Sequence, residues 1–432
     1  MIAARRGGAR WLTIVVVLIG AAAVLGVVAF WPRDDAPDLG TQPTTYVDAT
    51  VERVDTDSCR DPEVDAPGDC QVVTARLTSG DDSGDVVGFT VPASQFEVPE
   101  LAVGDRVVLL DVATAPSEFR YSFSDFQRST PLWWLLGLFV VVVILFGRWQ
   151  GVRALVGLAA SGAVLVAFMV PALLRDSPAV PVALSATVVI AFVALYLAHG
   201  VNAGTTVALA GTLVSLALTA GLAFVVAALA QFSGLADERA QTLRVTADAL
   251  DLRGLLVAGI VVGALGVLDD VTVSQVSIVA ALRRANPGLS PPLLYREATK
   301  VGRDHVASTV NTLVLAYAGA SLPLLLFFAQ GDQPVGRLLA GELIAVEIVR
   351  MLVGSIGLVA SVPITTALAA VVLRPRDDVL RRRQRRSIGV DPVYDGGAAP
   401  PPAHALLSRR ERRRQRRSGE ALDDLVPAED PS

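Results

Sequence analysis

Residues 254–282 read GLLVAGIVVGALGVLDDVTVSQVSIVAAL, and the charged side chains in these 29 residues are the adjacent Asp269 and Asp270. Because a transmembrane helix needs about 20 predominantly apolar residues, this stretch is long enough to cross a bilayer. A carboxylate at that depth is costly to ionise unless water or a partner compensates its charge. The stretch therefore predicts a membrane protein whose interior handles a polar group.

The composition of the whole chain supports this interpretation. Of its 432 residues, 52% are hydrophobic and 18% are charged, and the mean hydropathy is +0.52. A soluble globular domain carries about 25% charged residues, so the composition argues against that class. Apolar runs with few or no charges predict an all-α polytopic membrane protein of about eight transmembrane helices, at 11–30, 132–146, 154–174, 179–198, 204–230, 254–282, 306–329 and within 338–373.

Two of these runs need separate comment. The last run has 36 residues and would extend roughly 54 Å as a helix, whereas the hydrocarbon core is about 30 Å thick. We therefore expect residues 338–350 to form an amphipathic or re-entrant segment and residues 351–373 to form the span. The short run 132–146 begins beside Trp133 and Trp134, which suit a helix that enters through an interfacial aromatic belt.

Arginine and lysine set the predicted orientation, because short loops that carry them stay in the cytoplasm. With the N-terminus inside, the cytoplasmic loops contain Arg148 and Arg153 and the basic cluster in 283–303. The loop 231–253 runs against this rule, but four acidic residues balance its three arginines. We expect both termini in the cytoplasm and residues 1–31 as a cytoplasmic start plus an uncleaved anchor, since the first run lacks a small-residue cleavage site.

Residues 32–130 are expected to form an exported β domain between the first two spans. Hydrophobic residues alternate here with a period of two, in short segments separated by Gly, Asp and Pro, which is typical of a small barrel of the OB or SH3-like kind. The chain's two cysteines, Cys59 and Cys70, lie in this domain. An oxidising compartment favours a disulfide between them, and the lack of a nearby histidine argues against a zinc site.

The remaining segments are a transmembrane domain, 131–373, and a tail, 374–432. The tail has no apolar periodicity and contains two arginine blocks, so it is expected to be disordered in the cytoplasm. Because no aromatic side chains interleave with the arginines, we expect it to contact anionic membrane lipids rather than nucleic acid. Within the transmembrane domain, residues 198–204 read AHGVNAG and predict a tight turn between two helices rather than a ligand site.

The polar residues of the last three spans are the candidate functional residues. Asp270 and Ser274 share one helix face, whereas Asp269 points elsewhere because adjacent residues lie about 100° apart. In the next predicted span, 306–329, the polar residues Asn311 and Thr312 either hydrogen-bond across helices or supply oxygens to an ion or polar solute. A separate pair, Glu347 and Arg350, predicts an interfacial ion pair or a buried gate. The candidates for solute or ion binding are Asp269, Asp270, Thr272, Ser274, Gln275, Asn311 and Thr312.

Three blocks of the transmembrane domain carry a resemblance to a known family. They read GALGVLDDVTVSQ at 263–275, VGRDHVASTVNTLVLAYAGASLPL at 301–324 and EIVRMLVGSIGLVASVPIT at 347–365. In this order and spacing, the chain resembles the YibE/F-like multi-pass bacterial membrane proteins over about 132–373. The resemblance implies this architecture, with an anchored exported domain before it, but no transported species or reaction.

The resemblance can be followed residue by residue. The family's Asp-Val-x-x-Ser looks like residues 270–274, its Asn-Thr-Leu-x-Leu-Ala-Tyr resembles residues 311–317, and its Glu-x-x-Arg with Gly-Ser-Ile-Gly looks like Glu347, Arg350 and residues 354–357. Asp269 stands where the family is usually uncharged. The resemblance therefore favours Asp270 over Asp269 as the functional carboxylate.

Three functional classes fit these observations, and we favour a secondary transporter or permease for a small polar or ionic solute in the bacterial cell membrane. The alternative is a membrane-anchored scaffold or sensor whose exported domain binds a protein partner, in a chain that can also form homo-oligomers. An intramembrane hydrolase is the least favoured, because no second span places an aspartate at mid-depth and no HExxH motif is present. We expect no enzyme activity, cofactor, metal or nucleic-acid partner.

The predicted topology can be tested with a reporter that fluoresces only in the cytoplasm. Fused after Arg386, the reporter should be bright, and inserted near Gly80 it should be dark, because the arginine asymmetry places these positions on opposite sides of the membrane. Fluorescence of intact cells measures both. A bright insertion at Gly80 would reverse the orientation.

Overall fold

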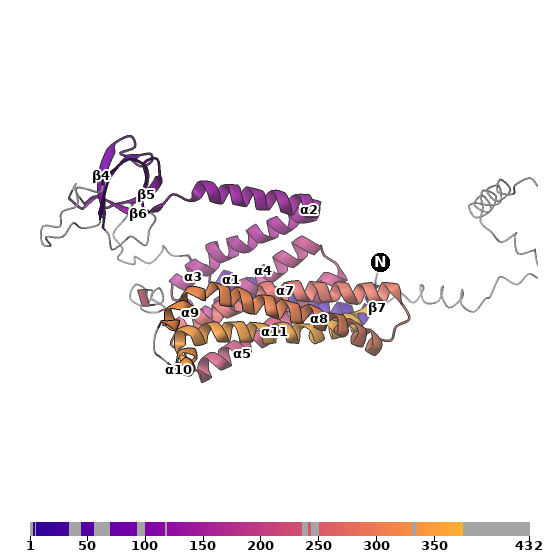
Figure 1. Ribbon diagram of the computed structural model, residues 1–432. Helices are drawn as coiled ribbons and strands as arrows, with labels where there is room; N and C mark the ends of the chain where they lie inside the picture. Colours follow the sequence, from indigo (N-terminus) through magenta and orange to yellow (C-terminus); the bar gives the residue numbers. More distant parts are fainter. Residues whose placement is uncertain are drawn as a thin grey trace, which may run out of the picture. The chain divides into compact units, whose positions relative to one another are not determined.

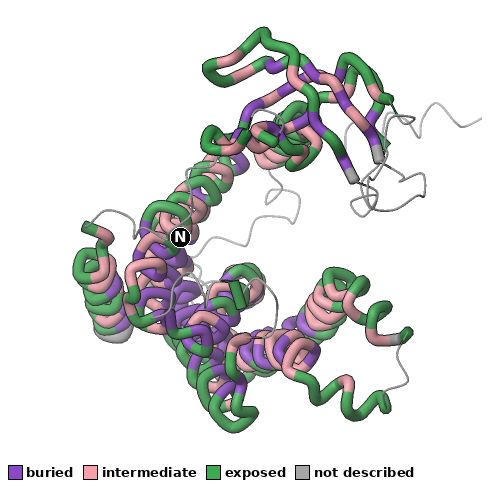
Figure 2. Tube along the Cα trace, turned by 90° about the vertical axis from the view of Figure 1, so that its left-hand side faces the viewer, coloured by how far each residue is buried: buried purple, intermediate pink, exposed green. Residues whose placement is uncertain are grey.

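The protein is described by a computed structural model, and the described residues are 3–4, 6–33, 45–55, 70–92, 100–116, 119–235, 241–242, 250–330 and 334–374. They form a helical part and a β part, which Figure 1 shows in sequence colours. Buried residues gather where the helices lie against one another and alternate along the strands (Figure 2). The two parts are described separately below.

Four of the long helices in the described part of the chain, α4, α5, α8 and α11, pack against α7, whereas α1 and α2 pack mainly against α4. Apolar helices that lack an amphipathic face bury small and branched side chains against one another, as the large cluster of buried Ala, Val and Leu in this part shows. The long helices are α1 (Arg6–Ala29), α2 (Ser129–Val164), α4 (Ala179–His199), α5 (Ala203–Leu229), α7 (Leu252–Ala285), α8 (Pro291–Ala320) and α11 (Glu342–Val372). Shorter elements are a π-helical turn at Leu165–Met169, α3 (Val170–Leu174), α9 (Leu322–Ala329) and α10 (Val335–Ala340).

Among the described residues, six helices are long and apolar enough to span a membrane, or seven if the bent pair α8 and α9 is one span. The sequence predicted eight spans, and the difference lies at Ser129–Leu174, which is one candidate span in the structure instead of two. The backbone of this segment is nevertheless broken at Arg148, which has φ 52° and ψ −131°. Arg148 lies between the two spans that the sequence predicts there. Residues 338–350, expected to form an amphipathic or re-entrant segment before the last span, are divided at Gly341, and α11 runs unbroken through Arg350.

The helical part has two distinct ends. At one end, which we call the arginine end, β1 (Ala3–Ala4) pairs with β7 (Leu373–Arg374), α4 turns into α5, and α7 turns into α8. The buried Arg283 fastens this end by donating to the carbonyl oxygens of Leu289 and Ala370. At the opposite end, Glu342 accepts hydrogen bonds from the backbone of Ser233 and Gly234, which ties the end of α5 to the start of α11.

The β part is a five-stranded antiparallel sheet with the order β4-β3-β2-β5-β6. Alternate residues of each strand face one core, which contains Val73, Ala75 and Val107, each fully buried. The edge strands β4 and β6 approach each other, so the sheet curls into a half-barrel. The strands are β2 (Thr45–Asp55), β3 (Cys70–Leu77), β4 (Val86–Pro92), β5 (Arg106–Asp111) and β6 (Tyr121–Phe126). A small β domain is thus present, whereas Cys59 lies outside the described residues and the disulfide stays a prediction.

A polar cluster fastens a loop of the β part to the β5–β6 hairpin. Asp82 accepts hydrogen bonds from Tyr121 Oη at 2.9 Å and from Arg120 Nη2 at 2.7 Å, and Arg120 Nε donates to Asp111 Oδ1 at 2.8 Å. Burial, together with the hydrogen bond to Asp82, raises the pKa of Tyr121 to about 12. The phenol therefore stays protonated at neutral pH and keeps donating to Asp82.

Helices α5 and α11 approach each other closely through two reciprocal contacts. A Cβ added to Gly211 of α5 would overlap Thr365 Oγ1, and a Cβ added to Gly357 of α11 would overlap Thr219 Oγ1. The two helices run antiparallel, so the glycine of each helix faces the threonine of the other. Small residues at the crossing let the backbones approach each other. Each helix carries Gly-x₃-Ser-x₃-Thr, namely Gly211, Ser215 and Thr219 on α5 and Gly357, Ser361 and Thr365 on α11.

We predict that Gly357→Ala lowers the free energy of unfolding by about 1–3 kcal/mol, the usual cost of overpacking. Thermal unfolding of the purified protein in detergent measures the effect. Adding Thr219→Ala should restore part of the loss, because it removes the hydroxyl that the new methyl group meets. Gly221→Ala on α5 is the control, since its Cβ meets open space. Equal unfolding midpoints for Gly357→Ala and Gly221→Ala would contradict the close contact.

Candidate functional site

Two of the candidate residues on α7 join helices to one another. Thr272 is fully buried, and its Oγ1 lies 2.7 Å from Thr212 Oγ1 of α5. Gln275 is 2% exposed, and its Nε2 donates to the carbonyl oxygen of Ala298 on α8 at 3.0 Å and to Thr366 Oγ1 of α11 at 2.7 Å. These residues therefore hydrogen-bond across helices, the structural role that the sequence left open for polar residues in spans.

The two aspartates of α7 have different surroundings. Asp269 Oδ1 is buried and has no hydrogen-bond partner in the part of the chain that the structure describes. Asp270 is exposed, about 100° around the helix from Asp269. A buried carboxylate oxygen without a partner is costly, so its retention needs an explanation such as water, a proton or an ion.

The candidates on α8 and α11 lie apart from this buried set. Asn311 and Thr312 are exposed on α8, and Thr312 Oγ1 donates to the carbonyl oxygen of Ser308 on its own helix. No hydrogen bond among the described residues joins Asp270 to Ser274, Asn311 or Thr312, and Ser274 is half-buried on α7.

Glu347 and Arg350 form an ion pair on α11. Arg350 Nη1 lies 2.7 Å from Glu347 Oε1, and both side chains are about 30% exposed. Arg350 therefore has its ionic partner one turn away on its own helix.

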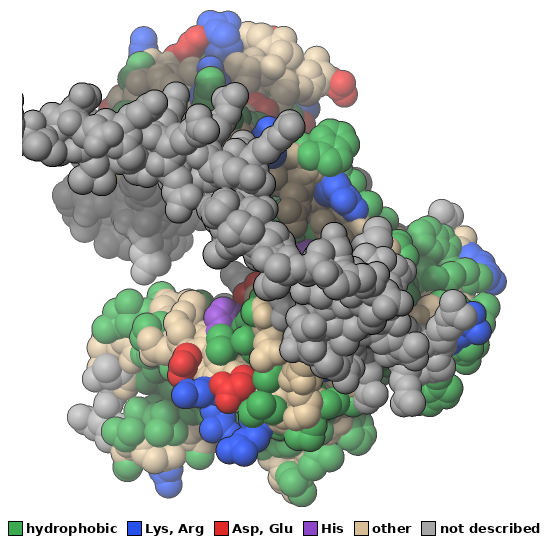
Figure 3. All heavy atoms as spheres, turned by 90° about the vertical axis from the view of Figure 1, so that its right-hand side faces the viewer, with side chains coloured by type: hydrophobic (Ala, Val, Ile, Leu, Met, Phe, Trp, Pro, Cys, Tyr) green, Lys and Arg blue, Asp and Glu red, His purple; other side chains and the backbone are tan. Residues whose placement is uncertain are grey.

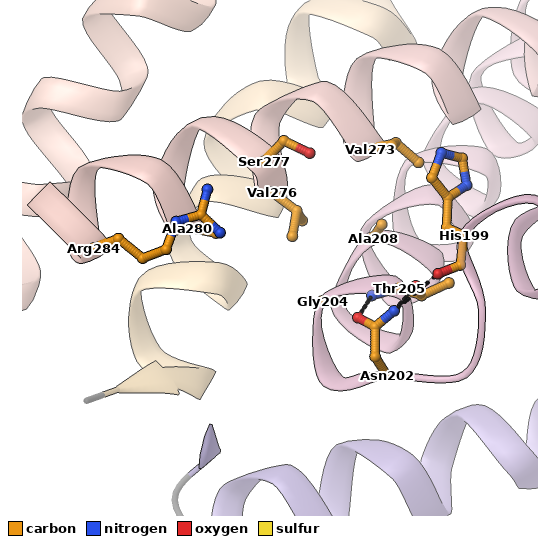
Figure 4. A pocket seen from close by; sticks show the side chains of 10 residues that line it. All are labelled: His199, Asn202, Gly204, Thr205, Ala208, Val273, Val276, Ser277, Ala280 and Arg284. Atoms are coloured by element: carbon orange, nitrogen blue, oxygen red, sulfur yellow. Dashed lines mark hydrogen bonds between the residues drawn. The ribbon is translucent and has the colours of Figure 1, made fainter. Parts of the chain in front are cut away.

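A pocket of about 250 Å³ opens at the arginine end, between the α4–α5 turn and the last turns of α7 (Figure 4). Figure 4 shows Arg284 on one side of it, His199 and Asn202 on the other, and Ser277 between them. The tight turn predicted at residues 198–204 is present, because the Asn202 side chain accepts from Thr205 N and donates to the carbonyl oxygens of His199 and Gly200. The sequence favoured a turn over a ligand site here, whereas the structure shows that residues of the turn also line a pocket.

The pocket leads toward the middle of the helices. Ala208 of α5 and Val276 of α7 line it. One turn further in, Thr212 follows Ala208 by four residues and Thr272 precedes Val276 by four, and these two hydroxyl groups contact each other. The threonine pair therefore lies one helical turn further along α5 and α7 than the lining residues Ala208 and Val276.

Asp269 lies on the face of α7 that lines the pocket. Residues Val273, Ser277, Ala280 and Arg284 line it with spacings of four, three and four residues, which place them on one side of a helix. Asp269 precedes Val273 by four residues and continues this face by one turn. The face that begins at Arg284 therefore ends at a carboxylate with an unpartnered buried oxygen.

Several residues of this site were not among the sequence candidates. His199, Thr205 and Arg284 line the pocket, and Thr212 completes the buried pair. The glycine-rich turn at 198–204 marked the α5 side of the pocket, but nothing in the sequence links it to α7. Among the described residues, no group of three or more His, Cys, Asp or Glu side chains is arranged to hold a metal ion.

The fold and the site define a helical protein with several apolar helices of membrane-spanning length, which is compatible with a membrane protein. A sequence model for YibE/F-like proteins matches residues 135–375, more than half of the chain, so the chain belongs to the YibE/F-like family. The match extends from α2 to the end of α11 and includes the pocket and both aspartates. No curated protein and no solved structure matched the chain.

Proposed function

We propose that the protein is a multi-pass protein of the bacterial cytoplasmic membrane that moves a small polar or ionic solute through its helical part. The pocket at the arginine end is the mouth of the path, and Asp269 is the group that a solute or a coupled proton meets further in. The observation that carries this proposal is the continuous face of α7 from Arg284 to the unpartnered oxygen of Asp269.

Two physical arguments support a transport role. An aspartate in the middle of a spanning helix is retained at a cost in stability, so it is a functional candidate by default. Transporters also use helices that break near the middle of the membrane, where backbone groups face a cavity. Here α8 and α9 form a pair bent by 59° at Ser321.

The arginine distribution supports a cytoplasmic position for the pocket. The arginine end carries exposed basic residues on α7 and α8, such as Arg284 and Arg303, and the short loops that carry such residues stay inside. In this orientation β2 to β6 lie outside the cytoplasm, because α1 starts at the arginine end and the β part follows it. The proposed path therefore opens to the cytoplasm at Arg284.

A partner-binding role for the β part is the second candidate function. The edge strands β4 and β6 present unpaired backbone groups, which an extended peptide of a partner can bind. If this role is the main one, deletion of residues 40–120 should abolish the cellular phenotype, whereas Asp269→Asn should leave it unchanged. A transporter should show the reverse sensitivity to Asp269→Asn.

We predict that a membrane-impermeant thiol reagent reaches Ser277→Cys and Asp269→Cys from the cytoplasmic side, because both positions lie on the pocket face of α7. Labelling of inverted and right-side-out vesicles, above the background of the unchanged chain, measures access from each side. Leu268→Cys is the matched control and should stay unlabelled, since Leu268 is fully buried beside Asp269.

Asparagine variants decide between the two aspartates. Asp269→Asn should abolish the activity that restores a null strain while leaving the protein folded, whereas Asp270→Asn tests the residue that the family resemblance favours. If Asp269→Cys is protected from both sides and Asp269→Asn retains full activity, the proposed path is wrong.

A further inference from the structure

We propose that the pocket at the arginine end binds an oxyanion of the phosphate type, carried either by a soluble solute or by a lipid headgroup. This inference rests on the proposed function, since it names the chemical group that the mouth of the path accepts. Binding at the mouth can nevertheless be measured without any transport, so the two proposals can fail separately.

The charge and hydrogen-bonding groups of the pocket suit an oxyanion. Arg284 is exposed at one side and His199 stands at the other, with the Ser277 hydroxyl between them (Figure 4). None of the residues that line the pocket is acidic. A guanidinium group presents several N–H donors in a fixed plane, which matches the oxygens of phosphate, and hydroxyl and imidazole groups add further donors.

The α5 side of the pocket is held in place before any ligand binds. Asn202 Nδ2 donates to the carbonyl oxygen of His199 at 3.0 Å and to that of Gly200 at 3.2 Å, which fixes the backbone that carries the His199 ring. Arg153 approaches the same turn, since its Nη2 lies 3.6 Å from the position of a Cβ on Gly200. A second guanidinium group is therefore close to the rim, and a rigid rim lowers the entropic cost of binding.

The exposed charged residues at this end of the helical part are mainly basic. Figure 3 shows basic and acidic side chains gathered on the lower part of the visible face. The exposed charged residues from Arg284 to Asp304 are four basic and two acidic, namely Arg284, Arg296, Lys300, Arg303, Glu297 and Asp304. Except for Arg284, these residues lie on α8, which packs against α7 through Gln275 rather than through the pocket face. The positive charge at the pocket itself therefore comes from Arg284 and, near the rim, Arg153.

The apolar wall of the pocket defines a further property of the ligand. Val273, Val276 and Ala280 of α7 and Ala208 of α5 line the side that leads inward. A pocket of mainly apolar lining with a few polar groups binds the apolar portion of a ligand and orients its charged group. The oxyanion is therefore expected between Arg284 and His199, beside the Ser277 hydroxyl group, with any apolar portion directed along α7.

The thermal unfolding midpoint of the purified full-length protein tests this inference. In one arm, phosphate replaces chloride at constant ionic strength in nonionic detergent, and in the other, phosphatidylglycerol replaces phosphatidylcholine in mixed micelles. Ligand that binds the folded state should raise the midpoint in proportion to its occupancy. Arg284→Gln and, separately, His199→Gln should weaken the apparent affinity for phosphate or phosphatidylglycerol about tenfold or more, because each removes a hydrogen-bond donor to the oxyanion.

Arg303→Gln is the matched control, because Arg303 is an exposed arginine at the same end that does not line the pocket. A midpoint shift with phosphate identifies a soluble oxyanion, and a shift with phosphatidylglycerol alone identifies a headgroup. Either result supports the site if Arg284→Gln reduces it and Arg303→Gln does not. No shift in either arm, or equal losses in the two arginine variants, overturns the inference. If the Asp269→Asn protein is inactive but still shows the midpoint shift, oxyanion binding at the pocket does not depend on Asp269. Binding and transport are then tested independently.

Discussion

The close approach of α5 and α11 is the contact on which the rest of the helical part depends. Lipid tails are as apolar as leucine, so helices in a membrane associate through close packing and hydrogen bonds rather than through hydrophobic burial. Gly211 and Gly357 permit that packing. Helix α7 then lies against both partners, through Thr212 and Thr272 on one side and Gln275 and Thr366 on the other. Through these bonds, the α5–α11 contact also fixes the position of Asp269.

The polar residues of α7 thus separate into two groups with different physical roles. Thr272 and Gln275 have partners on neighbouring helices, and each replaces a hydrogen bond to water with one inside the protein. Asp269 has a buried oxygen without such a partner. A residue that only held helices together would gain nothing from an unpaired charge in this position. The contacts between helices therefore explain the presence of Thr272 and Gln275, but they do not explain why residue 269 is an aspartate.

Hydrophobic runs predicted most of the long apolar helices, and a period of two predicted the β part, because both patterns follow directly from burial. The break at Gly341 was missed, since α11 and the residues before it are equally apolar and composition does not reveal where a helix starts. The contact between Gly211 and Thr365 could not be predicted from the sequence either, because small residues occur throughout the long helices. The pocket joins residues 199–208 to residues 273–284, and a single sequence holds no signal for that contact.

The two charged positions of the proposed path constrain each other. Arg284 and Asp269 are 15 residues apart, about 22 Å along α7, so a small solute cannot touch both at once. An oxyanion that is attracted to Arg284 would be repelled by an ionised Asp269 further in, and in a medium of low dielectric constant that repulsion is strong. An anion could pass Asp269 only while this residue carries a proton. If the mouth selects oxyanions, movement along this path therefore requires Asp269 to be protonated while the anion passes.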